Sequence, residues 1–289
     1  MAPTRALALA FAITAAFAVV EAIGGFVAGS LALLSDAGHM ITDAAALAAA
    51  MFAQRLARRP PSARASYGYA RAEVLAAFIN ALVMLLIVGG IVFEAIERLA
   101  TPTPVTGGLL LGIALVGLAV NLVAAWVLAR AQSSLNLRAA LLHVMGDMLG
   151  SVAAIVAAVV ILATGWMPID PILSLVVAII ILKSAWGIVK SSAHILLEGT
   201  PAGVTLADIK ADLETHVPEI RDAHHIHAWS ITGEQHMVTL HVLPASGVAA
   251  RDAVSAVQRR LAVRFGIDHA TVQVEEGVCL DLPDRDSTS

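Results

Sequence analysis

Six apolar stretches, each about twenty residues or longer, occupy the first two thirds of the chain. A helix needs about 20 mostly apolar residues to cross the hydrocarbon core of a bilayer. The stretches cover approximately residues 5–28, 31–52, 74–96, 105–128, 139–163 and 169–189. Clusters of Gly, Pro, Ser and Arg separate them, as at residues 101–104. The pattern therefore predicts an all-α, six-helix membrane bundle.

Composition excludes several other classes of protein. Hydrophobic residues make up 58% of the chain and charged residues only 14%, whereas soluble proteins are about 25% charged. The single cysteine, Cys279, excludes an internal disulfide framework and a four-cysteine zinc site. A net charge of -4 argues against a nucleic-acid partner.

The distribution of basic residues predicts the orientation of the bundle. Lys and Arg gather in the connections that follow the second, fourth and sixth stretches, whereas the connections after the first and fifth hold none. Short cytoplasmic loops carry the excess of Lys and Arg. We therefore expect both termini in the cytoplasm, together with the acidic C-terminal part, which holds seven of the ten histidines.

Two of the apolar stretches contain the same ionisable pattern. His39 precedes Asp43 by four residues in the second stretch, and His143 precedes Asp147 by four in the fifth. Positions i and i+4 share one face of a helix. An ionisable side chain near the bilayer centre costs about 2.5–3.5 kcal/mol on insertion scales, so each is a functional candidate. Each stretch thus offers one nitrogen and one oxygen ligand side by side.

The four side chains are expected at a similar depth. In two antiparallel helices rising about 1.5 Å per residue, His39 falls level with Asp147, and Asp43 roughly level with His143. Two imidazoles and two carboxylates suit a tetrahedral divalent ion, with zinc before others. Two aspartates cancel the charge of the ion, so metal entry into the protonated empty site must displace protons. The alternative is a set of interhelical hydrogen bonds without a metal.

The residue pattern of the C-terminal part predicts a small α+β module. Residues 205–216 and 248–265 have amphipathic helical periodicity, with Pro218 as a stop after the first. Residues 224–231, 237–243 and 270–274 have the pattern of strands. The order αββαβ indicates a sheet backed by helices.

Five segments resemble the cation diffusion facilitator family. They are the segments at residues 33–43, 67–80, 142–151, 169–174 and 195–201, and they occur in the family's order. The resemblance implies a six-helix domain over residues 1–198 and a cytoplasmic ferredoxin-like domain for regulation and dimerisation over residues 199–280. We expect a disordered tail over residues 281–289. It also implies a homodimer in the cell inner membrane that exports divalent metal from the cytoplasm in exchange for protons.

The resemblance also implies a set of site residues. It assigns the transport site to His39, Asp43, His143 and Asp147, a ligand set that in this family goes with Zn²⁺, often with Cd²⁺ or Co²⁺ accepted. The family's His-rich loop between the fourth and fifth helices is missing, since residues 129–138 contain no His. The loop between the second and third helices contains neither Asp nor His over residues 59–70, so a second family site is not carried over.

The histidines of the C-terminal part have two interpretations. The family places cytoplasmic ligands at the positions of His224 and His241 and near the third strand, where His269 and Glu275 are available and Gln273 replaces a His of some members. These residues could form a regulatory zinc site, or they could be solvated surface residues. In a regular strand, His225 and His227 share one face and His224 takes the other.

Two further functions compete with transport. An intramembrane metalloenzyme would need an open coordination position and a water-activating group. Four protein ligands close the shell and no His-Glu-x-x-His run exists, so we do not expect an enzyme. A membrane-bound metal sensor would bind Zn²⁺ without moving it. Zinc flux with counter-flow of protons separates a transporter from a sensor.

Overall fold

A computed structural model describes residues 3–28, 31–101, 107–130 and 135–276. The chain divides into two compact units, Met1–Ala193 and His194–Ser289, and each is described by itself. The expected disordered tail and Cys279 lie outside the described residues.

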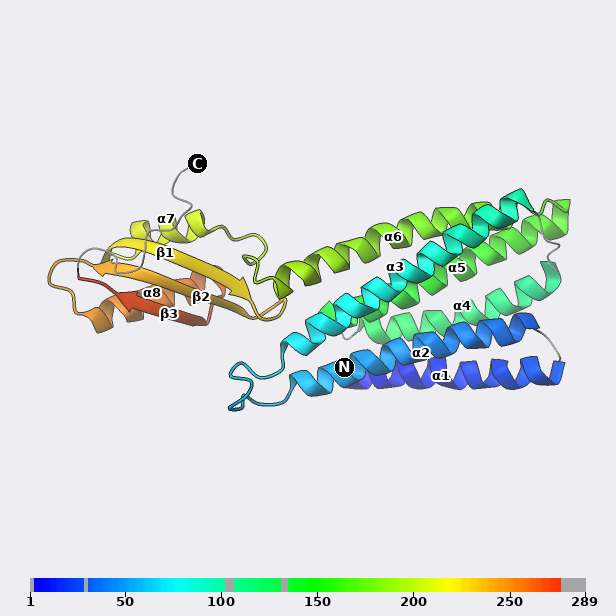
Figure 1. Ribbon diagram of the computed structural model, residues 1–289, viewed down its shortest axis with the longest axis horizontal. Helices are drawn as coiled ribbons and strands as arrows, with labels where there is room; N and C mark the ends of the chain where they lie inside the picture. Colours follow the sequence, from blue (N-terminus) through cyan, green and yellow to red (C-terminus); the bar gives the residue numbers. More distant parts are fainter. Residues whose placement is uncertain (1–2, 29–30, 102–106, 131–134, 277–289) are drawn as a thin grey trace. The chain divides into compact units, whose positions relative to one another are not determined.

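In the residues that the structure describes, the first unit contains six long helices (Figure 1). Each predicted apolar stretch is helical, and the helices extend up to seven residues beyond the predicted ends. Their bounds are α1 Pro3–Ala28, α2 Leu31–Ala57, α3 Arg71–Ala100, α4 Gly107–Ala129, α5 Leu135–Thr164 and α6 Ile169–Leu196. The extensions consist of polar and basic turns, such as Gln54 and Arg55 in α2, which contribute no apolar signal.

Four helices in the described part of the chain are long and apolar enough to cross a membrane. They lie at Arg71–Ala100, Leu110–Ala129, Ala140–Thr164 and Ile169–Leu196. Large apolar side chains remain exposed on them, including Leu86 at 77% and Phe93 at 72%. Apolar surface of this extent belongs against lipid.

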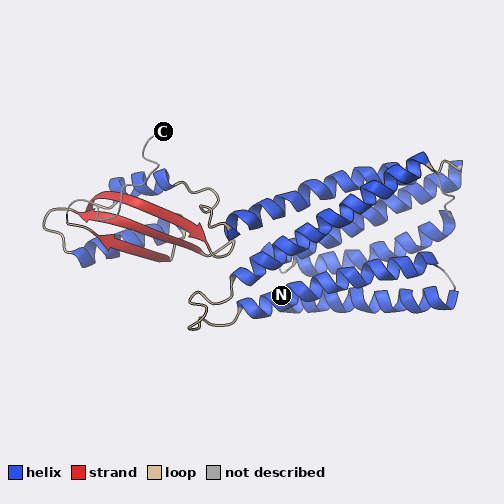
Figure 2. Ribbon diagram, in the orientation of Figure 1, coloured by secondary structure: helices blue, strands red, loops and turns tan. Residues whose placement is uncertain are grey.

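Over its described residues, up to residue 276, the second unit contains a three-stranded sheet with two helices (Figure 2). Its elements are α7 Leu206–His216, β1 Ile220–Ser230, β2 His236–Pro244, α8 Ala250–Phe265 and β3 His269–Val274. The predicted αββαβ order is confirmed. β1 begins four residues earlier than predicted, because it is an edge strand on which the polar residues Arg221 and Asp222 are tolerated.

The sheet order is β1-β2-β3, with β2 antiparallel to β1 and parallel to β3. On β2, the buried residues Val238, Leu240 and Val242 share a core with α7 and α8. Side chains alternate between the faces of a strand. His241 stands between Leu240 and Val242 in β2. Its side chain therefore belongs to the opposite face of the sheet, which the helices do not cover.

Shortening a side chain in the core of the second unit is expected to destabilise this unit strongly. Leu261 of α8 is fully buried, and Leu261→Ala is expected to cost about 2–5 kcal/mol. At about 1.4 kcal/mol per factor of ten, local opening becomes at least about 30-fold more frequent. Hydrogen–deuterium exchange of the full-length protein should show this in β1–β3. Leu197→Ala, at a residue that is 82% exposed, is the control, and equal exchange in both variants would contradict this assignment of the core.

An ion pair between α7 and α8 predicts how the stability of this unit depends on pH. Arg260 donates hydrogen bonds of 2.7 and 2.6 Å to the Asp212 carboxylate, and these lower the pKa of Asp212 below its ordinary value. The resulting stabilisation is complete above about pH 4, the ordinary value for an unfolded Asp, and is lost as pH falls through the lower folded value.

Asp212→Asn is therefore expected to lower the thermal midpoint of this unit at pH 7 and to flatten its fall below about pH 4. Calorimetry of the full-length protein measures both effects. Asp268→Asn, a change at an exposed carboxylate, is the control. An unchanged midpoint in Asp212→Asn throughout the pH range would show that the ion pair contributes nothing.

Candidate metal sites

The first site lies inside the helix bundle, where Asp43 and Asp147 line the same cavity. The cavity has a volume of about 410 Å³, enough for a divalent ion with part of its water shell. Asp43 is only 3% exposed, and Asp147 is half-buried. The two carboxylates come from α2 and α5, which contact each other. Two separate helices thus bring acidic groups to one cavity.

The two predicted histidine ligands lie on the same helices, one turn before the aspartates. The backbone is helical from His39 to Asp43 and from His143 to Asp147, so the i, i+4 spacing holds on both helices. The imidazoles themselves fall outside the described side chains. The structure therefore gives the helical register of all four predicted ligands and the surroundings of two.

Along the helices, the interior of the bundle differs on the two sides of the aspartate pair. Toward the end of α3 and the start of α6, the cavity continues to Arg98 and Asp170, whose side chains approach at 3.5 Å. Toward the opposite ends of the helices, an apolar cluster fills the bundle. It contains Leu7 of α1, Leu47 of α2, Leu128 of α4 and Leu137 of α5. A cavity lined mainly by apolar side chains, with polar ones such as Arg98 and Asp170 at its far end, thus leads from the carboxylates in one direction, and a packed apolar layer lies in the other.

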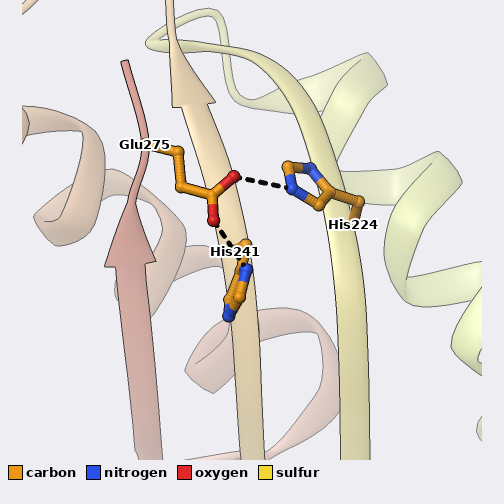
Figure 3. A group of neighbouring side chains, drawn as sticks. All are labelled: His224, His241 and Glu275. Carbon is orange, nitrogen blue, oxygen red and sulfur yellow. Dashed lines mark hydrogen bonds and ion pairs between the residues drawn. The ribbon is translucent and has the colours of Figure 1, made fainter. Parts of the chain in front are cut away.

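The second site lies in the second unit and consists of His224, His241 and Glu275 (Figure 3). Their ligand atoms all lie within 4.8 Å of one another. One Glu275 oxygen lies 3.0 Å from Nε2 of His224, and the other lies 3.0 Å from Nδ1 of His241. Ligands of a tetrahedral zinc ion lie roughly 3.3 Å apart, as bonds of about 2.0–2.1 Å require. Small side-chain rotations would let these three groups hold one ion.

A β-bulge brings His225 beside His241, which already pairs directly with His224 across the two strands. The register of β1 against β2 shifts between His224 and His227, and His225 has a φ of 49°, which is unusual for a residue other than glycine. Both His224 and His225 thus contact His241, with ring centroids 5.7 and 4.7 Å away. The expected placement of His224 and His225 on opposite faces is therefore wrong, because the extra residue interrupts the alternation.

Asp222 is a residue of this site that sequence analysis did not single out. Its Oδ2 lies 2.6 Å from Nδ1 of His224, and its Oδ1 accepts a hydrogen bond of 3.1 Å from Lys210 of α7. Partial burial acts to raise the pKa of Asp222, but the hydrogen bonds from Lys210 and His224 outweigh it and lower the pKa. The available signal was the i, i+2 spacing of Asp222 and His224, which places them on one face of a strand.

The fourth predicted cytoplasmic ligand, His269, is not part of this group. It is exposed at the start of β3 and pairs with Met237, whereas the β3 residue beside His241 is Gln273. Gln273 donates a hydrogen bond of 3.2 Å to Glu275. Two further histidines lie outside the group: His216 is exposed and caps the end of α7, while His236 is partly buried against Ser230. Burial lowers the pKa of His236.

Comparison with known proteins agrees with this architecture. The cation efflux transmembrane domain matches residues 7–197, and the cytoplasmic domain of cation efflux proteins matches residues 201–277. The chain is 46% identical over 277 residues to the zinc transporter ZitB of Escherichia coli (strain K12), covering 95% of this chain and 88% of the relative. It is 48% identical over 283 residues to ZitB of Pectobacterium atrosepticum, covering 96% and 87%.

A more distant relative shows the same near-complete coverage. The chain is 39% identical over 277 residues to the cadmium, cobalt and zinc/H(+)-K(+) antiporter of Bacillus subtilis (strain 168), covering 94% of this chain and 88% of the relative. Both domains of the family are thus matched in order, over almost the whole chain. This protein belongs to the cation efflux family, the cation diffusion facilitators.

Proposed function

We propose that this protein is an efflux transporter that moves divalent metal, principally Zn²⁺, out of the cytoplasm in exchange for protons. The observation that carries the proposal is the pair of carboxylates, Asp43 and Asp147, lining one cavity within the helix bundle. The names of the relatives support zinc as the substrate, with cadmium and cobalt as further candidates. All six long helices cross the membrane in this proposal, with both termini in the cytoplasm.

The transport site consists of Asp43 and Asp147 together with His39 and His143. Two carboxylates neutralise one divalent ion, so a filled site carries no net charge within the bilayer. When the ion leaves, the buried groups must take up protons or remain as an unfavourable pair of anions. Metal and protons therefore compete for one set of atoms, and exchange of the two follows from the ligands themselves.

The difference between the two directions from the aspartates supports alternating access. In the proposed orientation, the passage toward Arg98 and Asp170 leads to the outer side, and the apolar cluster around Leu47 and Leu137 blocks the cytoplasmic side. This arrangement suits release of the ion outward. Loading from the cytoplasm requires the helices to separate where the apolar cluster now packs.

The second unit supports a role in assembly and regulation. Its αββαβ order and the match to the family's cytoplasmic domain favour a ferredoxin-like fold that dimerises through this unit. The group of His224, His241 and Glu275 fits a zinc ion by donor type and spacing. A zinc ion held there would join β1, β2 and the end of β3, and would report cytoplasmic zinc to the transporter. His269 is left out of this site because of its position in β3.

Removing one carboxylate of the transport site is expected to abolish transport. In Asp43→Asn or Asp147→Asn, zinc flux in proteoliposomes should fall more than about 100-fold, beyond the cost of losing an outer-shell partner. Membrane insertion and dimer formation should remain. Glu97→Gln, a change at an exposed carboxylate near the end of α3, is the matched control. Flux at the normal level in either aspartate variant would be incompatible with this site.

Competition between metal and protons predicts that zinc uptake depends on the pH of the side of the membrane from which the metal is loaded. Zinc uptake into inverted vesicles should fall as the pH on the metal-loading side drops below about 6, where an ordinary imidazole begins to hold a proton. An imposed gradient that is acidic on the release side should accelerate uptake. Saturable zinc binding without flux would instead identify a sensor, and a flat response to pH would exclude proton competition.

A further inference from the structure

We propose that Asp222 is the positioning residue of the cytoplasmic metal site, and that Lys210 of α7 holds it in place. The contacts run in one series across the unit. Lys210 lies 3.1 Å from Asp222, Asp222 lies 2.6 Å from Nδ1 of His224, and Nε2 of His224 lies 3.0 Å from Glu275. The proposal rests on the cytoplasmic site described under the proposed function.

The geometry of His224 explains why it needs such a residue. An imidazole that binds metal through Nε2 must carry its proton on Nδ1, and a hydrogen bond from that proton fixes both the tautomer and the ring orientation. Asp222 is the acceptor placed for this bond, because its carboxylate lies next to Nδ1 while Nε2 points toward Glu275 (Figure 3). Without Asp222, the ring can rotate or carry its proton on the metal-binding nitrogen.

Helix α7 gives this carboxylate a fixed position. Its Lys210 pairs with Asp222 and also with Glu214 one turn later, at 3.3 Å. Glu214 in turn accepts a hydrogen bond of 3.3 Å from the backbone N–H of Ala223, the residue between Asp222 and His224. Two side chains of one helix thus secure the edge strand on which the ligand lies. The metal site is thereby linked to α7, which contributes none of its three ligands.

The test measures Co²⁺ binding to the full-length protein, in a background that carries Asp43→Asn and Asp147→Asn so that the transport site is disabled. Tetrahedral Co²⁺ with nitrogen and oxygen ligands absorbs visible light, and the part of the signal lost on adding His241→Ala belongs to the cytoplasmic site. In this background, Asp222→Ala should weaken Co²⁺ binding about 10–100-fold. Lys210→Met should weaken it less, and Asp208→Ala, a change at an exposed carboxylate of the same helix, should leave it unchanged.

Measurements on the metal-free protein separate a positioning role of Asp222 from a merely structural one. The thermal midpoint of metal-free Asp222→Ala should fall no further than that of metal-free Lys210→Met, which loses the same ion pair, and its Co²⁺ spectrum at saturation should change shape as the His224 ring turns. Co²⁺ affinity within twofold of the background would overturn the proposal for Asp222 while leaving the site standing. The proposal for Asp222 would also be overturned if the thermal midpoint of Asp222→Ala fell so far that unfolding of the protein explained the lost Co²⁺ affinity. Absence of any His241-dependent signal would overturn the site itself and the role of Asp222 with it.

Discussion

Two carboxylates within an apolar helix bundle can both be ionised only if positive charge accompanies them. Asp43 is almost completely buried and shares a cavity with Asp147, so this condition governs the first unit. A divalent cation satisfies it fully, and protons satisfy it when the cation leaves. In the proposed transport site, the same electrostatic requirement selects for charge and couples the release of metal to the uptake of protons. Affinity alone would trap the ion, whereas competition with protons allows it to leave.

The helices around this site leave a cavity on one side of it and pack closely on the other. A cavity extends from the aspartates toward Arg98 and Asp170, and packed Leu and Ala side chains occupy the other side. Alternating access needs such a difference, together with a second arrangement in which it is reversed. The apolar layer consists largely of small side chains such as Ala50, Ala124 and Ala140, which allow close helix packing and present few interlocking surfaces.

Spacing in the sequence predicted the helices and the helical register of the first candidate site, whereas the residues of the second candidate site came from the family resemblance. The i, i+4 pattern depends only on helical geometry, so it predicted correctly that Asp43 and His39, and likewise Asp147 and His143, lie one turn apart in continuous helix. The bulge at His225 was not predictable, because it arises from the pairing of β1 with β2 and leaves no local signal. The role of Asp222 depends on that same pairing and on Lys210 twelve residues earlier. His269 was expected near the site, but the register of β3 against β2 pairs it with Met237, four residues before His241.

The most direct test of this account is X-ray absorption spectroscopy of the zinc-loaded full-length protein carrying His241→Ala, in which the cytoplasmic site is disabled. The account predicts one tightly bound zinc ion with two imidazole nitrogens and two carboxylate oxygens at about 2.0–2.2 Å. A shell of oxygens alone, a sulfur ligand, or a protein that retains no zinc would contradict the claim that His39, Asp43, His143 and Asp147 close around a single ion.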